Sequence, residues 1–266
     1  MKIAFIGGGA MGEAMLAAIL DKGISTPQDI SISDIDEKRR QHLSQKYGVG
    51  VVGENRLAVD ERDIVLLAVK PQNLDEVMAG LKGQIQVSQL VISIVAGVRI
   101  DTLSLGLNHG SVVRVMPNTP AQIGEGMNVW TASAEVTEQQ KKWAGSIFGA
   151  MGREIYVDDE KYLDMATAVS GSGPAYVFLF IESLVDAAVA IGLPRDVALE
   201  LVLQTLLGSS HLVQKSGKPP AELQIMVTSP GGTTAEALLQ FEKGKFTDIV
   251  KQAVQAAYNR AKELGG

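Results

Sequence analysis

Hydrophobic positions follow two different patterns along the chain. Up to Tyr156, short runs of β-branched and apolar residues alternate with helical patterns. The runs that we predict as strands are Lys2–Ile6, Ile30–Ser33, Ile64–Ala68, Leu90–Val95, Val112–Val115, Gly126–Thr131 and Glu154–Tyr156. Such alternation is typical of βαβ units, and it predicts a parallel sheet with helices between its strands.

From Lys161 onward the predicted strands stop. Turn-forming residues separate the helical patterns there, at Gly171–Pro174, Gly192–Pro194, Gly217–Pro220, Ser229–Gly232 and Gly244. The short acidic segment Asp158–Glu160 lies where the pattern changes. We therefore predict two domains, an α/β domain at residues 1–159 and an all-α domain at residues 160–266.

The predicted helix that starts at Pro174 is apolar on nearly every face, as Val177, Phe178, Leu179 and Phe180 illustrate. A helix of this kind must be covered on all sides. It is either the central helix of the small domain or part of an interface between two copies of the chain. We favour the dimer interface.

Composition narrows the class of partner. The chain has 266 residues, a net charge of −6, 46% hydrophobic residues and no basic run beyond Lys38–Arg40, so we expect a small-molecule partner rather than nucleic acid or an anionic membrane. The longest apolar stretch, Tyr176–Ile191, contains Glu182 and Asp186, so we expect a soluble protein without a membrane span. We see no signal peptide and no metal-ligand pattern. The absence of cysteine excludes disulfides and thiol chemistry and fits a reducing cytoplasm.

The first candidate site is a glycine motif. Gly7-Gly8-Gly9-Ala10-Met11-Gly12 directly follows the strand at Ile3–Ile6 and opens a predicted helix from Met11 to Lys22. In this context Gly7 permits the tight turn, Gly9 lets a pyrophosphate approach the backbone, and Gly12 lets the helix pack on the strand. The pattern predicts a Rossmann-type dinucleotide-binding domain; the alternative is a glycine-rich turn without a ligand.

The nucleotide type is left open by conflicting charges. Asp34 lies about 20 residues after the glycine motif, where an Asp accepts from the 2′-hydroxyl of NAD. Arg39 and Arg40 follow closely, and a nearby Arg favours the 2′-phosphate of NADP. If the Asp34 side chain turns away to solvent, either nucleotide can bind.

Two proline-stiffened loops follow predicted strands, Ala68–Gln72 and Met116–Pro120. Ligands bind at the carboxyl ends of strands in such sheets. Lys70 is either a solvated loop lysine or a cation for phosphate or substrate. Asn118 either offers its amide near the nicotinamide or shapes the turn.

The loops lack an obvious proton donor. His42, His109 and His211 lie in polar or helical surroundings, and Lys70 is the sole candidate in a loop. Oxidation of an alcohol normally needs such a group. We therefore expect a substrate that can carry its own proton, such as an imine.

Two segments look like anion cradles. Ser170–Pro174 precedes the apolar helix, and Thr228–Thr234 precedes a helix predicted at Ala235–Gln240. The free N–H groups of a helix start bind carboxylates, and Pro at the first turn removes none that is needed. The alternative is that both are ordinary helix caps.

Six motifs together resemble the pyrroline-5-carboxylate reductase family, and the match covers essentially the whole chain. They are FIGGGAMG at 5–12, AVKPQ at 68–72, VMPNTPA at 115–121, AVSGSGPAYVF at 168–178, GLPRDVA at 192–198 and VTSPGGTTAEAL at 227–238. The resemblance implies hydride transfer from NAD(P)H to the C=N bond of 1-pyrroline-5-carboxylate, giving L-proline in the last step of proline biosynthesis. It also implies NADPH as the preferred donor, with NADH possible because of Asp34.

The resemblance also implies which residues form the site. The substrate-binding residues are Ser170, Gly171, Ser172, Gly173, Pro174, Ala175, Ser229, Gly232, Thr233 and Thr234, with Thr233 and Ser170 as the catalytic candidates. Thr233 places its hydroxyl beside the imine nitrogen. The cofactor-binding residues are Gly7, Gly9, Ala10, Met11, Gly12, Ser33, Asp34, Asn55, Ala68, Val69, Lys70, Pro71, Ser93, Ala96, Gly97 and Asn118.

The resemblance further implies an intertwined homodimer, in some members built into a larger ring. Two rival functions stay open. A reductase of 3-hydroxy acids would use a helix lysine as its acid, and Lys161 and Lys215 are the interior-like candidates. A protein that binds a dinucleotide without catalysis would act as a redox sensor.

Overall fold

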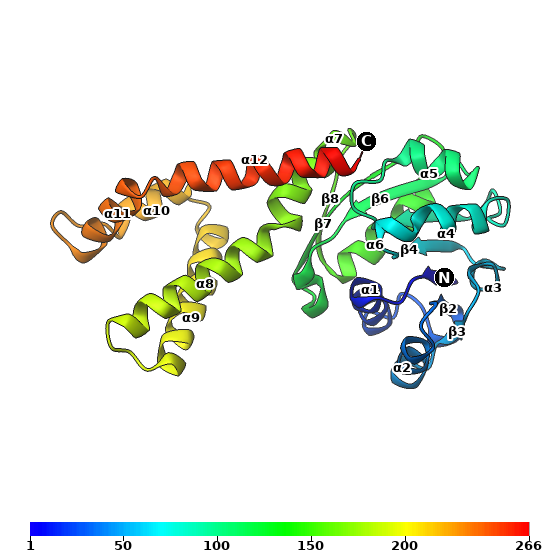
Figure 1. The fold of residues 1–266 in the computed structure, drawn as a ribbon, viewed down its shortest axis with the longest axis horizontal. Helices are drawn as coiled ribbons and strands as arrows, with labels where there is room; N and C mark the ends of the chain where they lie inside the picture. Colours follow the sequence, from blue (N-terminus) through cyan, green and yellow to red (C-terminus); the bar gives the residue numbers. More distant parts are fainter. Residues whose placement is uncertain (266) are drawn as a thin grey trace. The chain divides into compact units, whose positions relative to one another are not determined.

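The computed structural model describes residues 1–265, which divide into two compact units (Figure 1). Unit 1 comprises Met1–Ser172 together with the segment that begins at Ala257, and unit 2 comprises Gly173–Ala256. The domain boundary that we predict from sequence, between residues 159 and 160, stays a prediction.

Unit 1 is built on one twisted sheet. Within residues 1–265 the sheet has eight strands in the order β3-β2-β1-β4-β5-β6-β7-β8. The strands are β1 (Ile3–Ile6), β2 (Ile30–Ser33), β3 (Gly50–Val52), β4 (Ile64–Leu67), β5 (Leu90–Ser93), β6 (Val112–Met116), β7 (Gly126–Ala132) and β8 (Gly152–Tyr156). The order reverses beside β1, so the carboxyl ends of β1 and β4 flank the point where ligands bind in such sheets.

The sheet differs from the predicted one in two places. The strand β3 was not predicted, because its residues are exposed or half-buried and lack a continuous apolar run. The strand β7 runs antiparallel to β6, with Val115 opposite Trp130, so the sheet is not entirely parallel. The other strands occur where the sequence predicts them, with ends shifted by one or two residues.

Helices cover both faces of the sheet (Figure 1). The helices of unit 1 before the second unit are α1 (Ala10–Asp21), α2 (Glu37–Tyr47), α3 (Asn55–Val59), α4 (Leu74–Leu81), α5 (Ile100–Leu107), α6 (Glu138–Ala150) and α7 (Lys161–Ala166). Alternate residues of a strand point to opposite faces, and β1 shows this directly. Ile3 and Phe5 belong to one buried cluster and Ala4 and Ile6 to the other.

The predicted break at Ser170–Pro174 has a different form from the expected open loop. Thr167–Gly171 form a π-helical turn that continues α7 towards α8 (Gly173–Ala190). The Ser172 N–H donates to the carbonyl of Thr167 at 2.8 Å, which is a wide i to i+5 bond. Single π-turns of this kind occur frequently at functional sites.

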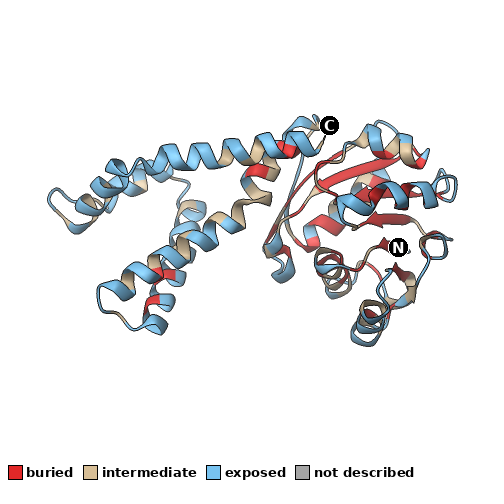
Figure 2. Ribbon diagram, in the orientation of Figure 1, coloured by how far each residue is buried: buried red, intermediate tan, exposed pale blue. Residues whose placement is uncertain are grey.

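Unit 2 is entirely helical and has a thin core. It contains α8, α9 (Arg195–Ser216), α10 (Pro220–Met226), α11 (Thr233–Lys243) and most of α12 (Phe246–Leu264). Its buried apolar residues are Val185, Ala198 and Val202, and most of its surface is exposed (Figure 2).

The helix α8 is not the central helix of a single chain. Val185 is its one buried residue, whereas Phe178 is 60% exposed and Leu179 is 70% exposed. The longer stretch Lys161–Ala190 has the length and composition that can cross a membrane, with 6% of its most apolar part buried. Our expectation of a protein without a membrane span considered the stretch Tyr176–Ile191 and did not allow for the longer continuous helix.

Candidate active site

The glycine motif has the conformation that a dinucleotide loop requires. Gly7 has a φ of +96°, and a Cβ on it would lie 2.6 Å from the carbonyl oxygen of Ala68. A Cβ on Gly12 would lie 2.9 Å from the carbonyl oxygen of Gly7. The predicted conformational roles of these two glycines, in the tight turn and in helix packing, are thereby confirmed.

Gly9 differs from its neighbours because the space beside it is open. A Cβ on Gly9 would meet no protein atom within 4 Å. Gly9 also caps the N-terminus of α1 without any side-chain hydrogen bond, so the first N–H groups of the helix are available. Open space and free N–H groups at a helix N-terminus fit the pyrophosphate of a dinucleotide.

The Asp34 side chain is held inward rather than turned to solvent. Its Oδ2 accepts from the Gly8 N–H at 2.8 Å, and its Oδ1 accepts from the Asp36 N–H at 2.9 Å. The carboxylate therefore lies directly beside the glycine loop, at the end of β2. This is the place where an acidic residue accepts from the ribose of a dinucleotide.

Both neighbouring arginines are engaged within the protein. Arg39 Nε donates to the carbonyl of Gly8, and its guanidinium pairs with Glu13. Arg40 Nη1 donates to the carbonyl of Asp34 at 2.7 Å. Neither guanidinium is therefore an unengaged cation at the end of β2.

Glu13 is the centre of a charged cluster beside the glycine loop. Burial by itself raises the pKa of Glu13, but hydrogen bonds from Lys46, Arg39, Tyr47 and His42 outweigh it and lower the pKa to about 2. The Lys46 Nζ and the Tyr47 hydroxyl each lie 2.9 Å from Glu13 Oε1. Sequence reasoning missed this cluster, because Glu13 on α1 is distant in sequence from its four partners, which all lie on α2.

Further predicted cofactor residues line the carboxyl edge of the sheet. The Ser33 hydroxyl donates to Asn55 Oδ1 at 2.7 Å, which brings the ends of β2 and the start of α3 together. The Ala68 N–H donates to the Ile6 carbonyl at 2.8 Å, so the segment Ala68–Pro71 begins beside the glycine loop. Lys70 is exposed.

The segment Ser93–Gly97 follows β5 at the same edge. Ser93 is fully buried and its Oγ accepts from the Val95 N–H at 3.2 Å. Gly97 has a φ of +77°, and a Cβ on it would lie 2.6 Å from the Cβ of Leu264 near the end of α12. The C-terminal part of α12 therefore packs against this segment within unit 1.

Asn118, two residues after β6, links the π-turn to the strand β7. Its Nδ2 donates to the Ser170 carbonyl at 3.0 Å, and its Oδ1 accepts from the Met127 N–H at 2.9 Å. A Cβ on Gly171 would lie 2.9 Å from Met116 Cε. These contacts support the alternative in which Asn118 shapes the turn, and its contact with the nicotinamide stays a prediction.

The second predicted cradle lies in unit 2. Gly231 has a φ of +70°, and the Gly232 N–H donates to the Ser229 carbonyl at 3.0 Å, so the segment is a tight turn. Gly232 caps α11 without a side-chain hydrogen bond. The helix starts at Thr233, two residues earlier than predicted, so Thr233 and Thr234 present N–H groups in its first turn.

The lysines of the rival alcohol chemistry are not interior. Lys161 is 58% exposed at its side chain and pairs with Asp159 at 2.7 Å, and Lys215 is exposed. His109 is buried, and burial lowers the pKa of its imidazole, whose Nε2 lies 2.9 Å from the Gln89 carbonyl. These positions give no support to a helix lysine acting as an acid.

Sequence reasoning also missed a buried ionic group in unit 1. Arg114, on β6, is 4% exposed at its side chain and contacts Glu160 and Asp164, each at 2.9 Å. A lone Arg in a β-branched strand gives little signal before its partners are known.

The comparisons with known proteins agree with this geometry. The family model for pyrroline-5-carboxylate reductase dimerisation matches residues 160–264, and the model for NADP oxidoreductase, coenzyme F420-dependent, matches residues 2–97. A pyrroline-5-carboxylate reductase from Synechocystis sp. is 42% identical over 100% of this chain and 98% of its own length. The chain belongs to the pyrroline-5-carboxylate reductase family.

Further relatives extend the match to plants and to solved structures. The Arabidopsis thaliana pyrroline-5-carboxylate reductase is 39% identical over 99% of this chain and 95% of its own length. A crystal structure of the Plasmodium falciparum pyrroline carboxylate reductase with NADP bound has a TM-score of 0.92 and 36% identity, covering 100% of this chain and 98% of that one. Family membership and the Rossmann-type fold with a C-terminal helical dimerisation domain, both expected from the sequence, are confirmed.

Proposed function

We propose that this chain reduces 1-pyrroline-5-carboxylate to L-proline with a hydride from NAD(P)H, the last step of proline biosynthesis. The full-length match to reductases of this name carries the proposal. The Plasmodium falciparum relative was solved with NADP, which supports NADPH as the donor. NADH stays an additional candidate, because Asp34 lies beside the glycine loop.

The chain's own residues would hold the dinucleotide along the carboxyl edge of the sheet. The N–H groups at Gly9, Ala10 and Met11 would bind the pyrophosphate, and Ser33, Asp34 and Asn55 would contact the adenine ribose. The segments Ala68–Pro71 and Ser93–Gly97, with Asn118, would lie beside the rest of the dinucleotide. When bound, NAD(P)H supplies the hydride that reaches the C=N carbon.

The substrate would be held by its carboxylate. The candidate donors are N–H and hydroxyl groups of Ser170–Ala175 and Ser229–Thr234. The Ser170 hydroxyl donates to the Ala166 carbonyl at 3.0 Å, so it would have to exchange this bond in order to donate to the substrate carboxylate. Thr233, at the start of α11, would place its hydroxyl at the imine nitrogen and orient the proton that the substrate carries.

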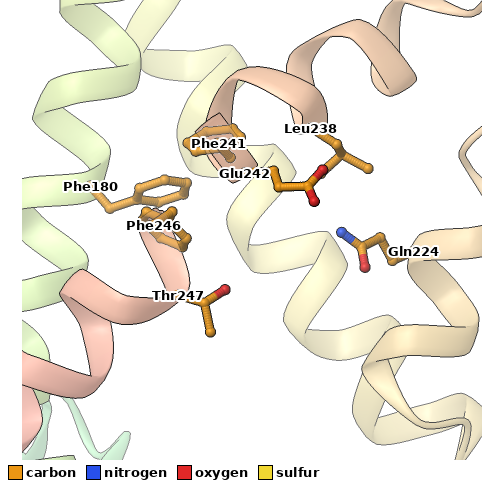
Figure 3. A pocket seen from close by; sticks show the side chains of 7 residues that line it. All are labelled: Phe180, Gln224, Leu238, Phe241, Glu242, Phe246 and Thr247. Carbon is orange, nitrogen blue, oxygen red and sulfur yellow. The ribbon is translucent and has the colours of Figure 1, made fainter. Parts of the chain in front are cut away.

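The same family implies a homodimer, and the surface of unit 2 supports it. A helical unit with so thin a core leaves an apolar surface that a second copy would cover. Figure 3 shows one hollow of this surface, about 420 Å³, where Phe180, Phe241 and Phe246 lie together. Their ring centroids are 5.2 Å and 6.2 Å apart in the two pairs that involve Phe246.

A second copy explains the apolar helix better than a bilayer does. The stretch Lys161–Ala190 contains Glu182 and Asp186, which both pair with Arg195 at the start of α9. Burying these charges in a bilayer would be costly. We therefore propose a cytoplasmic homodimer; its assembly into a larger ring is a further possibility that the family suggests.

One assay separates the proposed reaction from its rivals. Oxidation of NADPH or NADH is followed with pyrroline-5-carboxylate, with 3-hydroxyisobutyrate and without substrate. Turnover with the imine alone supports the reductase. Turnover with the hydroxy acid supports the alcohol reductase, and nucleotide binding without any turnover supports the redox sensor.

A further inference from the structure

A buried ionic group connects two predicted parts of the site. Arg114 lies on β6, and its side chain is 4% exposed. Its Nη1 donates to Glu160 Oε1 and its Nη2 donates to Asp164 Oδ1, both at 2.9 Å. The guanidinium fork therefore holds two carboxylates at once, a geometry that an ammonium group cannot reproduce.

Glu160 connects this ionic group to the region of the predicted cofactor-binding segment Ser93–Gly97. The same Oε1 that binds Arg114 also accepts from the Ile100 N–H at 2.9 Å. Ile100 is the first residue of α5, and it lies three residues after Gly97, the end of the segment Ser93–Gly97. Ser93 is also the residue of β5 that pairs in register with Arg114. Arg114 thus lies beside the first residue of the segment proposed to lie beside the dinucleotide, and Glu160 holds the chain three residues after its end.

Asp164 connects the ionic group to the region of the predicted substrate-binding residues. It is 8% exposed at its side chain and lies in α7, one turn before the π-turn Thr167–Gly171. Two further contacts from β6 and the turn after it reach the same π-turn, because Asn118 binds the Ser170 carbonyl and Met116 packs against Gly171. The π-turn is therefore fixed at its start and along its length.

Stability alone is a weak explanation for such a group. A buried ion pair must offset the desolvation of its charges, and apolar residues of similar volume often give equal or greater stability. The two hydrogen bonds of the guanidinium do fix the distance and orientation between the segments that carry the carboxylates, and catalytic sites need such fixed geometry. All of these residues belong to unit 1.

We propose that Arg114 is a positioning residue that sets the cofactor segment Ser93–Gly97, through Glu160, and the substrate-binding π-turn, through Asp164, in one fixed arrangement. This inference rests on the proposed function. It predicts that loss of the Glu160 carboxylate weakens nucleotide binding and that loss of the Asp164 carboxylate weakens substrate binding, because the two carboxylates support different segments.

The test measures nucleotide binding and substrate binding separately. Glu160→Gln should raise the Kd for NADPH, followed by its fluorescence, by roughly 3- to 30-fold, the range typical of coupling between neighbouring parts. It should change the KM for pyrroline-5-carboxylate much less. Asp164→Asn should raise that KM by a similar factor and leave the Kd for NADPH within about twofold. Glu138→Gln, which removes a carboxylate from an exposed pair with Lys141, is the matched control.

Two further variants test the fork itself. Arg114→Lys keeps the charge but not the fork, so it should impair both constants, and Arg114→Met should impair them at least as much. If the Glu160 and Asp164 variants lower only the Tm, or change both constants equally, the inference is overturned. The Kd for NADPH can be measured without turnover, so the Glu160 variant tests the inference even if the wild-type chain does not reduce the imine. Failure of the wild-type chain to reduce the imine would reject the proposed function and not this inference.

Discussion

Gly9 is the residue at which a ligand, rather than the fold, requires the absence of a side chain. Because a Cβ there meets no protein atom within 4 Å, Gly9→Asp should leave the Tm nearly unchanged. Its carboxylate would stand where the pyrophosphate approaches, so NADPH binding measured by calorimetry should be lost. Unchanged affinity would remove this loop from the site.

Neighbouring glycines supply the matched controls for that experiment. Gly9→Ala adds bulk without charge and should weaken binding less than Gly9→Asp. Gly7→Ala should instead lower the stability of the fold, because of the φ of +96° and the contact with the Ala68 carbonyl.

We expect Asp34 to influence the preference between NADPH and NADH. Its carboxylate lies beside the glycine loop, where the negative charge of a 2′-phosphate would repel it. Asp34→Ser should therefore raise the ratio of kcat/KM for NADPH to that for NADH. Steady-state rates with both nucleotides measure it, and an unchanged ratio would mean that the carboxylate does not face the ribose.

Glu13 makes the stability of unit 1 depend on acid pH. Its folded-state pKa of about 2 lies below the ordinary value of 4.5, so the folded chain binds fewer protons than the unfolded chain between these values. The stabilisation is present above pH 4.5 and is lost as the pH falls towards 2. Thermal unfolding of Glu13→Gln should show a lower Tm at neutral pH and a smaller further loss in acid; parallel curves for both proteins would contradict this.

At the scale of one element, the start of α11 combines a helix cap with a proposed catalytic hydroxyl. Thr233→Ala should lower kcat by roughly 10- to 100-fold if the hydroxyl meets the imine nitrogen, comparable to losing one well-placed hydrogen bond. Thr233→Ser should keep most of the activity. Full activity in the alanine variant would leave Thr233 as a helix residue only.

Elements were predictable from sequence where one local pattern decides them. The strands β1 and β4 are continuous apolar runs buried on both faces, so their existence follows from the local sequence. The direction of β7 depends on its pairing with β6 across the sheet, and no local pattern encodes that pairing.

The site was predictable to a similar extent. Its glycine loop has a local signature, whereas the form of the π-turn does not. Gly and Ser in a row predicted a break, but the wide hydrogen bond from Ser172 to Thr167 depends on packing against β6. The Arg114 group was missed for the same reason, since Glu160 and Asp164 become its partners only in the folded chain.

At the scale of the whole molecule, the proposed dimer raises the question of whether each site draws on both chains. Two inactive variants, Gly9→Asp and the double variant Thr233→Ala with Gly232→Pro, are unfolded, mixed and refolded together. If the Ser229–Thr234 turn serves the partner's site, half of the dimers gain one intact site, and activity should return to roughly a quarter of wild type for random pairing in a twofold dimer. No recovery in dimers verified by light scattering would show that each chain builds its own site.

The path of α12 has a consequence for how the protein is made. The helix begins in unit 2 and ends in unit 1, where Ala261 is buried and Leu264 packs against Gly97. On the ribosome, the nucleotide-binding unit must therefore wait for all of the second unit to be translated before its last contact can form. In a nascent chain that has completed β8, the segment at Gly97 still lacks its contact with Leu264. We therefore expect full nucleotide affinity only after α12 has emerged.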